Sequence, residues 1–119
     1  GVQSTEADAY ARSLAEGRLV TVPSANTRAD GMATRIPDPA ALEIIRRGAA
    51  RIVTVTDDEV AAAIRAYWQD THNLAEGAGA APLAALLQEK GRMAGKRVAV
   101  ILCGGNIDHA LFRSWVLGA

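Results

Sequence analysis

Val98-Ala99-Val100-Ile101-Leu102-Cys103-Gly104-Gly105-Asn106 is the most informative segment of the chain. Its unbroken run of small and branched apolar residues is typical of a strand buried on both faces, as in a parallel sheet. The two glycines after the run allow a sharp turn and a close approach of backbone to a ligand, because no Cβ intervenes. Ligands of open α/β sheets bind just outside the carboxyl ends of the strands. We therefore expect Cys103 to be the last side chain of a buried strand, facing such a crevice.

Around this stretch the sequence predicts alternating helices and strands. The helix at 38–47 begins with Asp38-Pro39, an N-cap followed by the first helical position. Thr56 and Glu59 form a capping box that opens a helix running to about residue 70, and Thr5 with Asp8 predicts a similar start for a helix at 6–16. The remaining predicted elements are the end of a strand at 1–3, a short extended piece at 19–22, a strand at 52–55, a helix that follows residues 74–81, the strand at 98–102 and a helix at 108–117. This order indicates an α/β fold, a layered parallel sheet with flanking helices.

Two glycine-containing stretches each allow two interpretations. The Cys103-Gly104-Gly105-Asn106 turn is either a ligand site or one of the many glycine turns that end buried strands, with the cysteine as a small apolar residue. Residues 74–81 open a helix with glycine and alanine. Those glycines either let amides at a helix N-terminus approach a partner or let helices pack closely. The spacing is not that of a dinucleotide fingerprint, because the stretch follows a helix rather than a strand.

Composition and charge argue against several classes of partner and site. The 119 residues suit one domain, and the formal net charge is zero without blocks of like charge, which argues against nucleic acid and anionic membrane surfaces as partners. A single cysteine excludes an internal disulfide framework and favours a reducing, cytoplasmic location. No apolar run is long enough to span a membrane. One cysteine and two distant histidines do not form a zinc site.

Five segments in succession resemble one family, the threonine/serine dehydratases of the fold-type II pyridoxal-phosphate enzymes, which include relatives of serine racemase. The segments are residues 1–3, the loop at 27–31, residues 52–59, residues 76–80 and residues 103–108. The resemblance covers nearly the whole chain. It implies that residues 1–119 are the C-terminal part of a tryptophan-synthase-β-like large domain, with pyridoxal 5'-phosphate bound in a cleft between two α/β domains.

The resemblance also implies which residues lie at the cofactor: Cys103, Gly104, Gly105, Asn106, Glu76, Asp30 and Gly31. In the family a Ser or Cys at the position of Cys103 hydrogen-bonds the pyridine nitrogen. A neutral partner does not hold that nitrogen protonated, which makes the ring a weaker electron sink and suits prompt β-elimination. Glu76 matches an acid at the edge of the pocket, and Asp30 with Gly31 matches the loop beside the cofactor.

The chain departs from the family pattern in two respects, which bear on catalysis and on metal binding. The family's catalytic lysine and its Gly-rich phosphate cup lie upstream of everything in this chain, whose lysines, Lys90 and Lys96, fall in polar turns. Without that lysine the chain has no covalent link to the cofactor and no base for the α-proton. Gln3 and Ala9 also stand where some relatives carry acids that bind a divalent cation, so no metal site is expected.

We therefore expect part of a pyridoxal-phosphate-dependent threonine/serine dehydratase (an ammonia-lyase), inactive alone and completed by a missing N-terminal half or a complementary chain, in a homo-oligomer. The complete enzyme would convert a small hydroxy amino acid to a 2-oxo acid and ammonia. One alternative is an amino-acid racemase of the same fold. Another is a lysine-less, non-catalytic ligand-binding module, which good solubility of the isolated chain would favour over aggregation through an exposed apolar sheet face.

Overall fold

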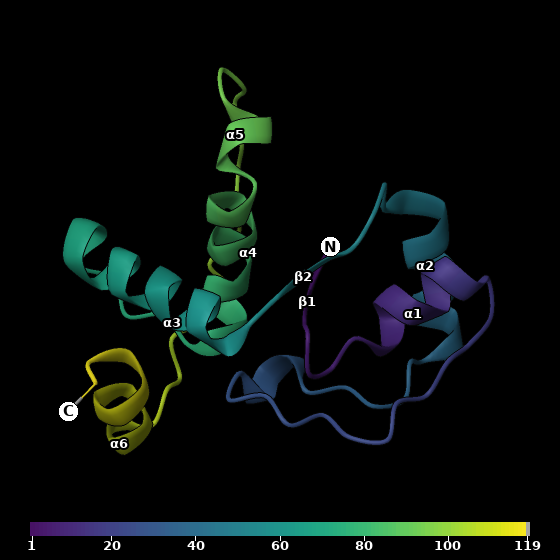
Figure 1. Cartoon of the computed structure of the whole chain (residues 1–119), viewed down its shortest axis with the longest axis horizontal. Helices are drawn as coiled ribbons and strands as arrows, with labels where there is room; N and C mark the ends of the chain where they lie inside the picture. The colour runs from purple at the N-terminus through teal and green to yellow at the C-terminus, as the bar shows by residue number, and fades with distance from the viewer. Residues whose placement is uncertain (119) are drawn as a thin grey trace.

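The computed structural model describes residues 1–118 (Figure 1). Two short strands and a set of helices form one connected structure. In chain order the elements are β1 (Val2–Ser4), α1 (Ala9–Glu16), the 3-10 turn η1 (Asp30–Met32), α2 (Pro39–Gly48), β2 (Val53–Val55), α3 (Asp57–Ala66), the π turn η2 (Tyr67–Thr71), α4 (Gly77–Gln88), α5 (Lys90–Met93), α6 (His109–Leu111) and the π turn η3 (Phe112–Val116). Over the described residues, no helix is both long enough and apolar enough to cross a membrane.

The sheet consists of β1 and β2, which run parallel with Val2 opposite Val53 and Ser4 opposite Val55. The amide of Val53 donates to the carbonyl of Gly1, and the amide of Thr5 donates to that of Val55, both at 2.9 Å. Helices and connecting segments separate the two strands along the chain, as a parallel pair requires. The prediction of an α/β fold with a parallel sheet and flanking helices is confirmed.

Residues 98–102 do not form the expected buried strand. The segment leads from the end of α5 to the Cys103 turn, but it belongs to no sheet within residues 1–118. Val98 is 45% exposed and Ile101 is 76% exposed. Burial on both faces needs a neighbouring strand and covering helices, and over residues 1–118 the only paired strands are β1 and β2. The prediction that this segment is buried on both faces is therefore wrong for this chain.

The predictions of helix N-caps were more accurate than the prediction of the strand at 98–102. The Asp38 carboxylate accepts from the amide of Ala41 at 2.8 Å and caps α2, and Thr56 and Glu59 form both bonds of the capping box at α3. These two predictions are confirmed. The helix expected at 6–16 begins only at Ala9, because the amides of Glu6 and Ala7 bond back to the hydroxyl and the carbonyl of Ser4.

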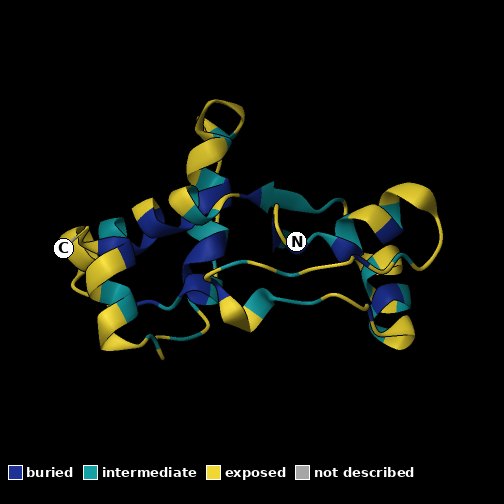
Figure 2. Cartoon of the chain, turned by 60° about the horizontal axis from the view of Figure 1, so that its bottom comes forward, coloured by how far each residue is buried: buried dark blue, intermediate teal, exposed yellow. Residues whose placement is uncertain are grey.

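Packing of α3 against α4 forms the main core, and the buried parts of the two helices are dark blue in Figure 2. Val60 and Ile64 of α3 are fully buried against the alanine-rich face of α4, which includes Ala80 and Ala84. Small side chains let the two helix backbones approach closely, so a chain with few aromatic residues can still fill its core. This helix pair positions the segments that make up the candidate site.

Candidate functional site

The Cys103-Asn106 turn is fixed to the residue that precedes α4. Glu76, the N-cap residue of α4, donates its backbone amide to the carbonyl of Gly104 at 3.0 Å. Its side-chain Oε2 accepts from the amide of Asn106 at 3.1 Å. One residue thus holds the turn by two hydrogen bonds, and the second has a charged acceptor, which makes it stronger than a neutral bond.

Close backbone contacts require the glycines of this region. A Cβ on Gly79 would lie 2.4 Å from the carbonyl oxygen of Gly104, and one on Gly105 would lie 2.5 Å from that of Leu74. A Cβ on Gly104 would lie 2.6 Å from Oε1 of Glu76. These separations are shorter than van der Waals contact, so any larger residue would push the turn away from α4.

The glycines that open α4 are therefore used for packing, which was one of the two interpretations that the sequence allowed. Gly77 lies against Ala29, where a Cβ would approach the Ala29 Cβ to 2.6 Å, and Gly79 lies against the Gly104 carbonyl. Pro82 lies in the interior of α4.

The loop that contains Asp30 and Gly31 reaches the same place. A Cβ on Gly31 would lie 3.0 Å from the Ala78 Cβ and 3.9 Å from Oε1 of Glu76. Asp30 accepts from the amide of Gly31 at 2.9 Å and so stabilises its own turn, η1. A small cavity of about 80 Å³ is lined by Asp30, Glu76 and Asn106, among other residues. Glu76, the glycine turn and the 30–31 loop are thus brought together by the fold.

Asp57 is a residue whose role in the site sequence reasoning missed. One carboxylate oxygen accepts from the Thr27 hydroxyl at 2.5 Å and the other accepts from the amide of Arg28 at 2.8 Å. These bonds tie the start of the 27–31 loop to the first turn of α3. The sequence offered Asp57 only as an acid favoured at a helix N-terminus, and no local pattern indicates a bond to a residue thirty positions earlier.

Cys103 is the first residue of the turn that Glu76 holds. It is a free thiol and its residue is exposed. Sequence reasoning placed it at the end of a buried strand, and this burial is absent because the preceding segment is itself exposed. The thiol therefore remains accessible to a ligand, while the backbone that follows it is fixed by Glu76.

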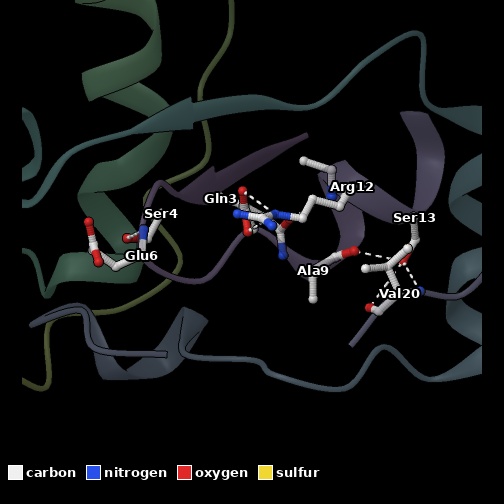
Figure 3. A network of polar contacts seen from close by, with 9 residues as sticks. Gln3, Ser4, Glu6, Ala9, Arg12, Ser13 and Val20 are labelled. Atoms are coloured by element: carbon white, nitrogen blue, oxygen red, sulfur yellow. Dashed lines mark hydrogen bonds and ion pairs between the residues drawn. The ribbon is translucent and has the colours of Figure 1, made fainter. Parts of the chain in front are cut away.

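Gln3, where some dehydratases carry a metal-binding acid, has a structural role here. Its side chain is buried, and its Oε1 accepts from the amide of Ala11 at 2.8 Å, which joins β1 to α1 (Figure 3). The neighbouring acid Asp8 pairs with Arg12 at 2.9 Å. Within residues 1–118 no group of three His, Cys, Asp or Glu side chains is arranged to hold a metal ion.

Comparison with known proteins identifies the class of protein that this fold and site define. The family of pyridoxal-phosphate dependent enzymes matches residues 1–104, and the chain belongs to this family. Within it, the chain is 41% identical over 108 residues to the L-threonine ammonia-lyase of Geobacter sulfurreducens, an alignment that covers 91% of this chain and 27% of that protein. The chain thus spans roughly a quarter of that relative's length.

Two solved structures share the fold. A threonine deaminase from T.th. superposes with a TM-score of 0.84 at 35% identity, covering 91% of this chain and 39% of the other. Maize serine racemase superposes with a TM-score of 0.83 at 28% identity, covering 98% of this chain and 37% of the other. The predicted family and its fold-type II architecture are confirmed.

The described residues fit pyridoxal phosphate, the cofactor of the family. An exposed thiol can serve as a hydrogen-bond partner of a pyridine nitrogen. Gly104 and Gly105 follow Cys103 and have no side chains, so only their backbone lies beside the thiol. The contacts with Glu76 keep that backbone in place.

Proposed function

We propose that this chain forms the pyridine-nitrogen side of the active site of a pyridoxal-phosphate-dependent ammonia-lyase for small hydroxy amino acids such as threonine or serine. The observation that carries the proposal is the Cys103-Asn106 turn, which Glu76 holds by two hydrogen bonds while the Cys103 residue remains exposed. The family membership and the activity for which the Geobacter sulfurreducens relative is named support it.

Each residue has a distinct task in this proposal. Pyridoxal phosphate, when bound, supplies an electron sink for chemistry at the amino-acid carbons. The Cys103 thiol donates a hydrogen bond to the ring nitrogen without protonating it. Gly104, Gly105 and Asn106 hold the thiol at that position, and Glu76 keeps the turn from moving. Asp30 and Gly31 border the cofactor on the neighbouring side.

The rest of the enzyme comes from polypeptide outside this chain. Lys90 lies in α5 and Lys96 in the turn that follows it, and the segment 98–102 separates both from Cys103 along the chain. The residue that bonds covalently to the cofactor and moves the α-proton is therefore supplied by the remaining polypeptide or a complementary chain. We place the complete protein in the cytoplasm as a homo-oligomer.

A racemase of the same fold is the second candidate. The observation that favours it is the serine racemase of maize, which superposes almost as well as the threonine deaminase. Racemisation and elimination begin with the same loss of the α-proton, and they differ in whether the hydroxyl leaves.

Product analysis of the purified complete protein separates the two candidates. Incubation with L-threonine and L-serine should release 2-oxo acid and ammonia in equal amounts. A denaturing mass spectrum of the same sample should show polypeptide heavier than this chain, either as one species or as a partner. Formation of D-serine without 2-oxo acid would replace the lyase by the racemase. A lone 12.5 kDa species with bound ligand and no turnover would support a non-catalytic module.

A further inference from the structure

Trp115 is buried next to the candidate site, although the proposed function gives it no task. Its side chain is 6% exposed and belongs to the same core as Val60 and Ile64 of α3. The indole nitrogen is buried and has no hydrogen-bond partner within residues 1–118. Packing of the ring, and not a hydrogen bond, therefore determines where the indole lies.

The far edge of the indole covers the first residue of α4. A Cβ on Gly77 would lie 3.2 Å from Cη2 of Trp115 and 2.6 Å from the Cβ of Ala29. The indole edge and Ala29 thus close the space on this side of Gly77, and the backbone has no room to shift toward them. Glu76 directly precedes Gly77 as the N-cap residue of α4. Trp115 therefore limits the movement of the residue that holds the glycine turn.

Trp115 and Glu76 also line the same cavity. This is the cavity of about 80 Å³ that Asp30 borders as well, and it is large enough to hold water. A shorter side chain at position 115 would enlarge the cavity. The larger space would admit more water beside the Glu76 carboxylate and allow its side chain further rotamers. The size of residue 115 therefore affects how well the carboxylate is fixed.

The C-terminal helical segment that carries Trp115 is fixed at both ends. At its start, the Asp108 carboxylate accepts from the amides of Ala110 and Leu111 at 2.8 and 3.1 Å. At its end, the guanidinium of Arg65 in α3 donates to the carbonyl of Val116 at 2.9 Å, and the two segments lie near each other in Figure 1. The chain thus runs from the glycine turn through a capped helix and back to the start of α4.

We infer that Trp115 is a positioning residue for the cofactor site: its indole holds the start of α4, and thereby the Glu76 contacts that fix the turn after Cys103. The inference rests on the cofactor-binding role proposed above for this turn, and not on which reaction follows. A loosely held Glu76 would leave the amide of Asn106 without a fixed acceptor. The Cys103 thiol would then be less well placed for the cofactor nitrogen, and the cofactor would bind more weakly.

Matched tryptophan variants of the complete protein test the inference. Trp115→Phe keeps an aromatic ring in the core but removes the Cη2 edge that faces Gly77. Trp68→Phe, made at an indole that is 46% exposed and contacts the ring of Phe112, is the control. The apo protein is titrated with pyridoxal 5'-phosphate and binding is followed by absorbance. Trp115→Phe should raise the cofactor Kd about fivefold, and Trp68→Phe should change it by less than about twofold.

A double-mutant cycle separates positioning from a general loss of stability. Glu76→Ala should raise the cofactor Kd about tenfold, and adding Trp115→Phe should raise it by less than about twofold more, because the carboxylate through which Trp115 acts is then gone. Effects that multiply to about fiftyfold would overturn the inference. A less stable Trp115→Phe protein with an unchanged Kd would also overturn it, because the role of Trp115 would then be structural only.

A change at the far end of the segment gives a second test that leaves the core intact. Arg65→Met removes the donor to the Val116 carbonyl and should raise the cofactor Kd about threefold. Arg46→Met, made on α2 at a side chain that is 44% exposed, is the control and should change the Kd by less than about twofold. Equal values for these two variants would contradict the inference, even where Trp115→Phe does not fold.

The outcomes also distinguish this inference from the proposed function. A complete protein that binds the cofactor but releases no 2-oxo acid would refute the proposed reaction, and the Kd comparison would still decide the inference. If Glu76→Ala left the Kd unchanged, the proposed role of the turn would fail and the inference with it. If Glu76→Ala weakened binding and Trp115→Phe did not, the inference alone would fail.

Discussion

Residues 98–102 and the turn at 103–106 are adjacent in the chain but differ completely in their contacts. The turn has its backbone held by Glu76 and pressed against α4, whereas the five residues before it make no backbone hydrogen bonds within residues 1–118. Val98 and Ile101 of the first segment are exposed, although Leu102 packs partly against the core. The turn, which lacks such apolar side chains, is nonetheless fixed by its backbone contacts.

The comparison separates contacts that are made within residues 1–118 from burial that would need a further strand. The geometry around Cys103 is built from residues 29–31, 76–79 and 103–106, all of which belong to this chain. Burial of residues 98–102 in a sheet requires a neighbouring strand, and over residues 1–118 the only paired strands are β1 and β2. Local contacts thus preserve the candidate site even where the sheet beside it is incomplete.

The largest effect is expected when the turn is forced off α4. Gly79→Val places side-chain atoms within 2.4 Å of the Gly104 carbonyl oxygen, which is backbone and has little room to move. The free energy of unfolding of the complete protein should fall by about 3 kcal/mol. Urea denaturation measures this change. Gly91→Ala is the matched control, because no atom lies within 4 Å of the position its methyl group would take, and its effect should be about 0.5 kcal/mol or less.

A smaller effect is expected from the side chain that holds the turn. Glu76→Ala removes the acceptor of the Asn106 amide and should lower the free energy of unfolding by about 1.5 kcal/mol. Glu76→Gln keeps an amide oxygen as acceptor and should cost less. Asp58→Asn, which changes an acid in the first turn of α3, is the control and should alter stability by about 0.5 kcal/mol. If Glu76→Ala has no greater effect than the control, Glu76 does not hold the turn.

The capping box of α3 gives an effect that depends on pH. The amide of Thr56, with smaller contributions from Gln88 and the Thr56 hydroxyl, holds the pKa of Glu59 below its ordinary value of 4.5. Its contribution to stability is therefore fully present above pH 4.5 and is lost as the pH falls through the lower folded-state value.

Glu59→Gln should lower the free energy of unfolding by about 1 kcal/mol at pH 7, and the difference from wild type should shrink below pH 4.5. Denaturation midpoints from pH 7 to pH 3 measure this. A difference that stays constant over the whole range would show that the carboxylate charge does not stabilise the cap. The substitution should leave the turn unaffected, because Glu59 makes no bond to it.

Features that depend on local contacts were predicted correctly from the sequence, whereas several that depend on distant contacts were not. The Asp38 cap and the Thr56-Glu59 box depend on residues three apart, and both were predicted correctly. The parallel pairing of β1 with β2 followed from the order of elements. The resemblance to a known family grouped Glu76, the 30–31 loop and the glycine turn, which the fold indeed brings together.

The errors arose where the outcome depended on distant partners. Residues 98–102 have the composition of a buried strand, but composition does not say which chain segment will cover it. The bonds from Asp57 to the 27–31 loop cross thirty positions and leave no local pattern. The late start of α1 reflects competition from Ser4 for the amides that a longer helix would use.

The most direct measurement of the central claim compares three forms of the complete protein: wild type, Cys103→Ser and Cys103→Ala. All three should unfold within about 0.5 kcal/mol of one another, because Cys103 is exposed. Steady-state release of 2-oxo acid from L-threonine should persist in Cys103→Ser, which keeps a neutral hydrogen-bond donor, and fall roughly tenfold in Cys103→Ala. Wild-type turnover and unchanged cofactor binding in Cys103→Ala would contradict the role of Cys103 as the partner of the cofactor nitrogen.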